Sequence, residues 1–159
     1  MANLFDRFQS ITRKTPNFTL SKKEVARTSQ LHPFEERNVH PELDKITREL
    51  FDNGHYSHAT FEAYKYIDKK VQTLSHCNES GYKLMTQAFN ESSPLIKLTN
   101  LSNTSEKDEQ KGYMFIFSGA VMAIRNPRGH EVSVRETPTQ CLDHISLASL
   151  LLRRLNDTK

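Results

Sequence analysis

Hydrophobic residues recur every three or four positions through most of the chain after residue 38, which is the spacing of one face of an amphipathic helix. No segment alternates hydrophobic and polar residues for long enough to build a sheet. The spacing predicts five helices, over residues 41–51, 56–75, 81–90, 105–124 and 138–156. We therefore expect an all-α fold, an antiparallel bundle of four main helices with shorter helical pieces.

Prolines and glycines mark where these helices should begin and end. Pro41 and Pro138 stand at the first helical position, which proline favours, and Gly54 marks the end of the first helix. Pro127 is expected to end the fourth helix, because its ring disfavours helical geometry at the preceding residue and supplies no backbone donor. Residues 91–103 are rich in serine and asparagine and predict a loop, with room for a short strand.

The predicted fourth helix differs from the others because its second half is apolar around most of its circumference. The side chains concerned are Tyr113, Ile116, Phe117, Ala120, Val121 and Ile124. A helix of this kind is buried or forms an interface. One small bundle would leave part of it uncovered, so we expect a two-fold homodimer through this region.

Charge divides the chain into two parts. Residues 1–37 hold seven Lys/Arg against four Asp/Glu, whereas residues 38–159 hold fifteen of each, so the formal net charge of +3 lies in the first part. Hydrophobic spacing predicts short helices within this basic arm, before Pro16 and from Ser21 to Ser29. The arm could contact nucleic acid or a partner, or it could pack on the domain or on a second subunit. A net charge of three is a modest field and favours the second interpretation.

Several classes of protein are disfavoured by what the sequence lacks. No apolar run approaches the length of a membrane span, and the first residues do not resemble a signal sequence. Cys77 and Cys141 lack metal-ligand spacing and no further ligand accompanies His55 and His58, so we expect no metal site and a reducing cytoplasm as the location. Neither GxxxxGK[ST] nor GxGxxG occurs, and no cofactor is expected.

The candidate chemistry gathers in residues 124–131, which read Ile-Arg-Asn-Pro-Arg-Gly-His-Glu. Arg125 carries a permanent charge, Asn126 an amide, and His130 a group that changes charge near neutral pH, which together suit phosphate chemistry. A turn at the Pro-Arg-Gly break would bring the three together. A structural interpretation is also open, since arginine at a helix C-terminus complements the helix dipole and Pro-Arg-Gly is an ordinary turn composition.

The run Arg-Asn-Pro-Arg-Gly-His resembles the Arg-polar-x-x-x-His signature of HEPN domains, small all-helical proteins that include many metal-independent ribonucleases. A wider similarity, over roughly residues 38–156, is to the Ymh-type family of bacterial and prophage-borne proteins, which is commonly placed among the HEPN domains. That similarity is carried by His40 to Phe51, Asp52 to Tyr56, Phe61-Glu62-Ala63, Arg125 to Glu131 and Ala148 to Leu155. The resemblance implies a HEPN-like helical domain over residues 38–159. It also implies a dimer whose shared cleft cuts RNA in several toxin and anti-phage branches.

The resemblance assigns catalytic roles to three residues. Arg125 matches the signature arginine and would stabilise charge on the phosphate, Asn126 would orient it, and His130 would act as base or acid. One position departs from some HEPN toxins, because Val132 stands where they carry a tyrosine that a partner enzyme modifies. Control of that kind is therefore not expected.

Three more residues are candidates for substrate binding. Arg128 lies inside the signature run, and Glu62 and Lys65 lie one turn apart on the predicted second helix. Glu62 and Lys65 are equally well explained as an exposed polar face.

Two functions from different classes follow. The first is a metal-independent endoribonuclease, a toxin or anti-phage defence effector that leaves 2',3'-cyclic phosphate and 5'-hydroxyl ends. The second is a non-catalytic HEPN module that binds nucleic acid or a partner protein. For the first function we expect RNA as substrate and an antitoxin or defence-system protein as partner.

Overall fold

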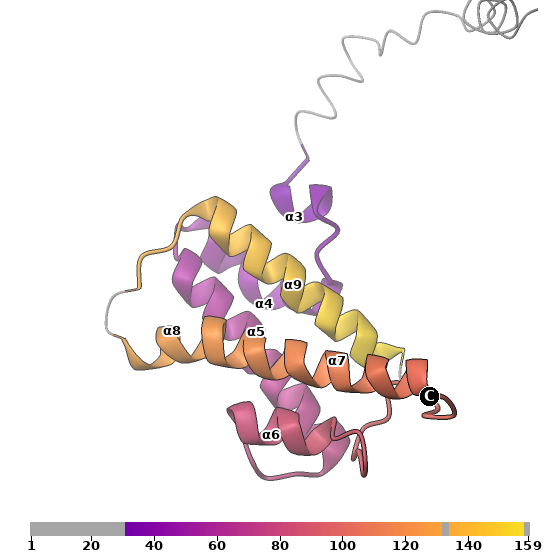
Figure 1. Cartoon of the computed structure of the whole chain (residues 1–159). Coiled ribbons are helices and arrows are strands. Elements are labelled where there is room, and N and C mark those ends of the chain that lie inside the picture. Colours follow the sequence, from indigo (N-terminus) through magenta and orange to yellow (C-terminus); the bar gives the residue numbers. More distant parts are fainter. Residues whose placement is uncertain (1–30, 132–133, 158–159) are drawn as a thin grey trace, which may run out of the picture. The chain divides into compact units, whose positions relative to one another are not determined.

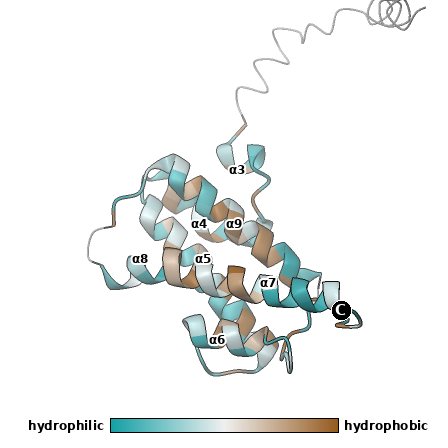
Figure 2. Cartoon of the chain, viewed as in Figure 1, coloured by the Kyte–Doolittle hydropathy of each residue, from teal (hydrophilic) through white to brown (hydrophobic). Residues whose placement is uncertain are grey.

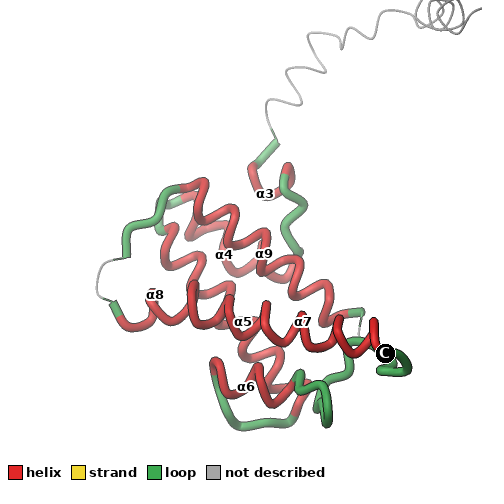
Figure 3. Tube along the Cα trace, in the orientation of Figure 1, coloured by secondary structure: helices red, strands yellow, loops and turns green. Residues whose placement is uncertain are grey.

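The computed structural model describes residues 31–131 and 134–157. The chain divides between His32 and Pro33, and the second unit, Pro33–Lys159, holds the bundle. Every regular element in the described ranges is helical and none is a strand (Figure 3). The all-α prediction is confirmed. The short helices predicted before residue 30 fall outside the described residues.

The bundle consists of a few long helices joined by short ones (Figure 1). In chain order the elements are α3 (Pro33–Glu36), α4 (Pro41–Asp52), α5 (Tyr56–Ser75), α6 (Gly81–Ala88), α7 (Thr104–Ala120), the π-helical turn η1 (Val121–Arg125), α8 (Asn126–His130) and α9 (Pro138–Asn156). No helix in the described ranges is long and apolar enough to cross a membrane.

Helix α5 is the central element of the bundle. It contacts α4, α6, α8, α9 and η1, and its inward positions carry small or apolar side chains such as Ala59, Ala63 and Ile67, all fully buried. Because small residues let neighbouring helices approach closely, α5 can pack against several partners at once. Along α7 and α9, hydrophobic positions alternate with hydrophilic ones in the manner of amphipathic helices (Figure 2).

One contiguous core fills the space between these helices. Its largest fully buried side chains are Phe34, Leu43, Tyr64, Ile67, Leu84, Met85, Phe89, Phe117, Ile145, Leu151, Leu152 and Leu155. Every helix longer than one turn except α8 contributes to this set or lies against it. Phe34 of α3 belongs to the core as well, so the packed structure extends before residue 38, the predicted start of the domain.

The predicted helix boundaries are largely confirmed, and the residues that predicted them lie at the helix ends in the structure. Pro41 and Pro138 occupy the first turns of α4 and α9. Thr137 caps α9 through a reciprocal capping box with Gln140. Gly54 has a φ of 78°, a conformation that glycine adopts without strain, and it follows the end of α4.

The loop between α6 and α7 contains no strand, and the buried side chain of Gln110 pairs several of its backbone groups. Gln110 accepts a hydrogen bond from the backbone N–H of Leu98 at 2.8 Å and donates to the carbonyls of Phe89 and Ile96. Its amide therefore satisfies backbone groups that the loop itself cannot pair.

The prediction that Pro127 ends the fourth helix was wrong. Helix α7 continues through η1 into α8 without a break, and Pro127 lies in the first turn of α8. In η1 the backbone N–H of Asn126 reaches the carbonyl of Val121, five residues earlier. This wider turn accommodates the proline, because the first turn of a new helical segment needs no N–H at that position. The helix ends at His130.

Candidate functional site

The signature residues lie along a continuous helical segment rather than around a corner. Arg125 is the last residue of η1, and Asn126 and His130 are the first and last residues of α8. Arg125 Nη1 donates to the side-chain oxygen of Asn126 at 3.2 Å. The amide oxygen of Asn126 thus orients the guanidinium of Arg125, and a helix rather than a turn brings the two together.

Arg125 lies partly buried against the ring of Phe61 on α5. Its guanidinium carbon is 5.8 Å from the ring centroid, within the range of a cation–π interaction. Its Nε is buried and has no hydrogen-bond partner. Among the described residues no carboxylate pairs with Arg125. Its positive charge is therefore not compensated within the described part of the bundle.

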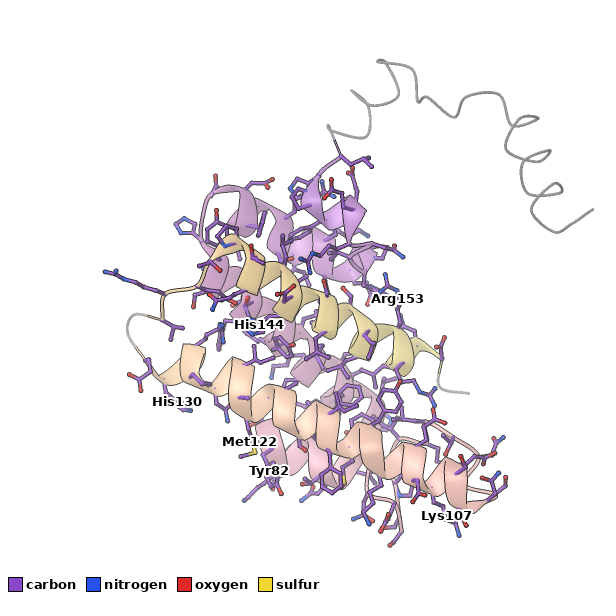
Figure 4. The ribbon with its side chains drawn as sticks, turned by 45° about the horizontal axis from the view of Figure 1, so that its top comes forward. Tyr82, Lys107, Met122, His130, His144 and Arg153 are labelled. Carbon is purple, nitrogen blue, oxygen red and sulfur yellow. The ribbon has the colours of Figure 1, made fainter. Side chains whose placement is uncertain are left out.

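His130 ends α8 and is exposed to solvent. Figure 4 shows it at the end of the helical segment that carries Met122. In the preceding turn, a Cβ on Gly129 would lie 3.1 Å from Cε2 of Phe61, so glycine allows α8 to approach α5 at this point. The close approach places the backbone beside His130 against the ring on which Arg125 rests.

Lys65 and Glu62 belong to the same neighbourhood through α5. Lys65 Nζ is 5.8 Å from the centroid of the Phe61 ring and 2.9 Å from Glu62 Oε1. Glu62 also lies 3.6 Å from His58 Nε2. Phe61 therefore has one cation from α5 and one from η1 beside its ring. Sequence reasoning assigned no role to this phenylalanine.

Arg128 is directed into the protein. Its side chain is only 8% exposed and pairs with the carboxylate of Glu136, whose side chain is 1% exposed. Arg128 Nε donates to Glu136 Oε2 at 2.9 Å, Nη2 lies 2.9 Å from Oε1, and Nη1 donates to the carbonyl of Ile124 at 2.7 Å. These bonds tie α8 to the segment that leads into α9, so the structure gives Arg128 a positioning role.

Glu136 collects further donors and forms a cluster with His144 that the sequence did not reveal. His144 Nδ1 lies 2.5 Å from Glu136 Oε1, and Thr60 Oγ1 donates to the same oxygen at 3.0 Å. The eight-residue separation of Glu136 and His144 spans a helix start, and only the packing of α8 and α5 brings Arg128 and Thr60 to them.

Two other buried groups beside this cluster are held in their neutral forms. Tyr64 donates its hydroxyl to the carbonyl of His144 at 2.9 Å, and burial raises its pKa well above the ordinary value. Burial likewise raises the pKa of the Cys141 thiol to about 11. Cys141 is therefore protonated at neutral pH and is not an activated nucleophile.

No group of three or more His, Cys, Asp or Glu side chains in the described ranges is arranged to hold a metal ion. Both cysteines are free; Cys77 is partly exposed and Cys141 is buried.

The structure is thus a helical bundle in which one helical segment carries a partly buried arginine, the amide that orients it and an exposed histidine. The family model described as Hypoth_Ymh, protein of unknown function, matches residues 37–155. The chain belongs to that family, which confirms the Ymh-type resemblance of the sequence. No curated protein and no solved structure matches the chain.

Proposed function

We propose that this protein is a metal-independent endoribonuclease of the HEPN type, acting as a toxin or anti-phage defence effector. Arg125, Asn126 and His130 are its catalytic residues, and RNA is cut to 2',3'-cyclic phosphate and 5'-hydroxyl ends. The resemblance of the Arg-Asn-Pro-Arg-Gly-His run to the HEPN signature supports this proposal, and so do the surroundings of Arg125.

The main support for the proposal is that no carboxylate of the described residues pairs with Arg125. Four other arginines, Arg37, Arg48, Arg128 and Arg154, pair with carboxylates within the bundle. Arg125 is partly buried, rests on Phe61 and has a buried Nε without a partner. A buried donor left unsatisfied costs free energy, so such an arrangement is expected where an external group completes it. An anion such as a phosphodiester fits a guanidinium best.

The reaction follows from the groups available. A base removes the proton of the ribose 2'-hydroxyl, and the 2'-oxygen forms a bond to phosphorus. The bond from phosphorus to the 5'-oxygen breaks as that oxygen receives a proton. Arg125, oriented by Asn126, stabilises the additional negative charge on the phosphoryl oxygens. His130 exchanges one of the two protons.

Lys65 extends the binding surface along α5. It lies beside the same phenylalanine ring as Arg125, so the two cations can contact neighbouring phosphates of one strand. The partly exposed ring of Phe61 beside them is the group that we propose stacks on a base, an interaction common in the recognition of single-stranded RNA.

A non-catalytic module remains the alternative function. In that case Arg125, Lys65 and Phe61 bind nucleic acid or an acidic segment of a partner, and His130 transfers no proton. The two functions differ in the result of one substitution, because binding does not require a group that changes its protonation state.

The proposed enzyme is a homodimer that works in the cytoplasm. Phe115, Ile116 and Met122 on α7 and η1, together with Tyr82 on α6, are large hydrophobic side chains left exposed in the single chain. Exposed apolar groups of this size favour association, and a two-fold dimer would cover them. An antitoxin or defence-system protein is the further partner that a toxin requires.

The decisive variant is His130→Ala. We expect cleavage of single-stranded RNA to fall by about 10²- to 10⁴-fold with RNA affinity nearly unchanged, because acid–base catalysis contributes to rate rather than to binding. Arg125→Ala should reduce both affinity and rate, and Arg125→Lys should restore affinity better than rate, since a point charge cannot replace a two-pronged donor.

The controls distinguish chemistry from folding. His76→Asn replaces an exposed histidine that caps α5 in a left-handed conformation, which asparagine tolerates, and it should cut RNA like the parent. Circular dichroism and sedimentation must show that each variant is folded and assembled. Cleavage should persist in EDTA. A folded His130→Ala protein that cuts at the parental rate would exclude the catalytic role, and a parent that binds RNA without cutting it would favour the module.

A further inference from the structure

We propose that His144 is a second catalytic histidine of the same site, with Glu136 as its positioning residue. This inference rests on the proposed ribonuclease function and deepens it, because it names the second proton-transfer group that strand cleavage requires. The geometry of His144, its exposure and its link to α8 each support it.

The hydrogen bond from His144 Nδ1 sets the orientation and the tautomer of the ring. Nδ1 lies 2.5 Å from Glu136 Oε1, so Nδ1 carries the proton and donates it to the carboxylate. Nε2 then holds a lone pair in the neutral ring and can accept a proton. When it does, the adjacent carboxylate stabilises the imidazolium that forms, as in other carboxylate–histidine pairs.

Glu136 is fixed in the position that this role needs. Its side chain is 1% exposed and its two oxygens are engaged by Arg128, Thr60 and His144. A carboxylate held from three directions cannot rotate away from the ring. Arg128 compensates its charge, so the pair can stay ionised while buried.

His144 itself is held at the backbone but open at its ring. Its carbonyl accepts a hydrogen bond from the Tyr64 hydroxyl on α5 at 2.9 Å, while its side chain remains 28% exposed. A histidine that served only to fill the core would be enclosed. Here Nδ1 is directed to the buried carboxylate, and within the described part of the chain no hydrogen bond engages Nε2.

Arg128 connects His144 to the helical segment of the signature. Both side chains donate to Glu136, Arg128 from Nε and Nη2 and His144 from Nδ1, and Arg128 lies three residues after Arg125 on the same helical segment. Figure 4 shows His144 on α9 and His130 on α8 at the same end of the bundle. The charged and titratable groups that face His144 are thus Glu136 from the preceding segment, Arg128 from α8 and Tyr64 from α5.

The two histidines divide the proton transfers. His144 Nε2 takes the proton of the 2'-hydroxyl as the 2'-oxygen bonds to phosphorus. Protonated His130 gives its proton to the 5'-oxygen as the bond from phosphorus to that oxygen breaks. One proton enters the protein and one leaves it, so the cyclic phosphate and the 5'-hydroxyl form without any additional reactant.

The test is the dependence of kcat/KM on pH for His144→Ala against the parent and the His76→Asn control. The parent should give a bell-shaped profile, whose rising limb reports the base. For His144→Ala, the rate should fall about 10²- to 10⁴-fold and the rising limb of the profile should disappear. Added imidazole should restore part of the rate. Glu136→Gln should lose less, because glutamine can still accept from Nδ1. An unchanged profile in His144→Ala, with the parent active, would overturn the role of His144 and leave the ribonuclease function standing.

A second measurement decides the matter without turnover. In protein labelled with ¹⁵N at histidine, an RNA whose 2'-hydroxyls are methylated can bind but cannot be cut. We expect the ring nitrogens of both His130 and His144 to shift on its addition, with those of His76 unmoved. A shift at His130 alone would place His144 outside the site and overturn the inference. A parent that binds this RNA but cuts no RNA would instead count against the proposed function.

Discussion

Arg125 and Arg128 lie three residues apart in one helical segment, and their guanidinium groups meet different surroundings. Arg128 donates to Glu136, whose carboxylate is buried with it, and to the carbonyl of Ile124. Arg125 meets the face of Phe61 and one amide oxygen. The sequence shows two similar arginines, and only the path of the neighbouring segments determines which of them keeps its charge available.

Phe61→Leu tests whether the ring supports the binding surface. Leucine fills similar volume but removes the π face beside Arg125 and Lys65, each 5.8 Å from the centroid. A base stacked on an aromatic ring contributes about 1 to 3 kcal/mol, so RNA affinity should fall about 5- to 150-fold, as fluorescence anisotropy would measure.

Tyr113→Leu provides the matched control for Phe61→Leu. Arg154 lies 5.2 Å from the Tyr113 ring, so this variant loses a similar contact outside the proposed site. It should bind RNA like the parent. Equal loss of affinity in both variants would show that the effect is on folding, and no loss in Phe61→Leu would exclude the ring from binding.

At the residue scale, the sequence predicted the candidate site residues that lie close together along the chain. Arg125, Asn126 and His130 could be chosen because they are close in sequence and chemically suited to phosphate. Glu136 and His144 could not be joined to them, because their contacts depend on how α8, α5 and the start of α9 pack. Residues that act through tertiary contacts leave no periodic signal in a single sequence.

At the element scale, helix starts were predictable and one helix end was not. Threonine as N-cap followed by proline in the first turn predicted the start of α9, and the structure places Thr137 and Pro138 in those positions. Pro127 was ambiguous, since proline both ends helices and begins them. The π-turn η1 resolves the ambiguity by letting one helical segment end where the next begins. That turn sets where Arg125 lies relative to α8.

The N-terminus of α4 should make stability depend on pH. His40 caps α4 by accepting a hydrogen bond at Nδ1 from the backbone N–H of Glu42, which only the neutral ring can do. Desolvation by burial lowers the pKa of His40 below its ordinary value, against the opposing effect of Glu42. The unfolded chain therefore binds this proton more readily than the folded one. Stability from this cap is complete above the unfolded pKa of about 6.5 and declines as pH falls through the lower folded pKa.

His40→Asn should remove this dependence while keeping the cap, because asparagine is a favoured N-cap and does not titrate in this range. Urea unfolding at pH 7.5 and at pH 5 would measure it. The parent should lose more stability between the two values than the variant does. Equal losses would show that His40 does not contribute to the pH response.

At the scale of the whole molecule, the hydrophobic core is well packed, but several large apolar side chains stay exposed on the surface. The buried residues form one cluster that joins all the longer helices. Outside it, Phe115 and Met122 are 59% and 52% exposed, although they lie on the helical segment that carries the site. Helix α6, which carries Tyr82, packs against η1, which carries Met122 (Figure 4). The apolar circumference predicted for the fourth helix is thus divided between the core and an exposed face, and this face is the surface through which we propose that two chains associate.

Met122→Glu should convert the proposed dimer into a monomer. The side chain is exposed in the single chain, so glutamate there should leave the fold intact, as surface substitutions generally do. In a two-fold interface the substitution occurs twice, and each carboxylate would be desolvated without a partner. A penalty of about 3 kcal/mol or more would weaken association at least about 100-fold. Sedimentation equilibrium at micromolar concentration should give a dimer mass for the parent and a monomer mass for Met122→Glu.

Leu150→Glu, at a similarly exposed leucine on α9, is the matched control and should remain dimeric. A monomeric parent would contradict the dimer, whereas a dimeric Met122→Glu protein would move the interface to another face.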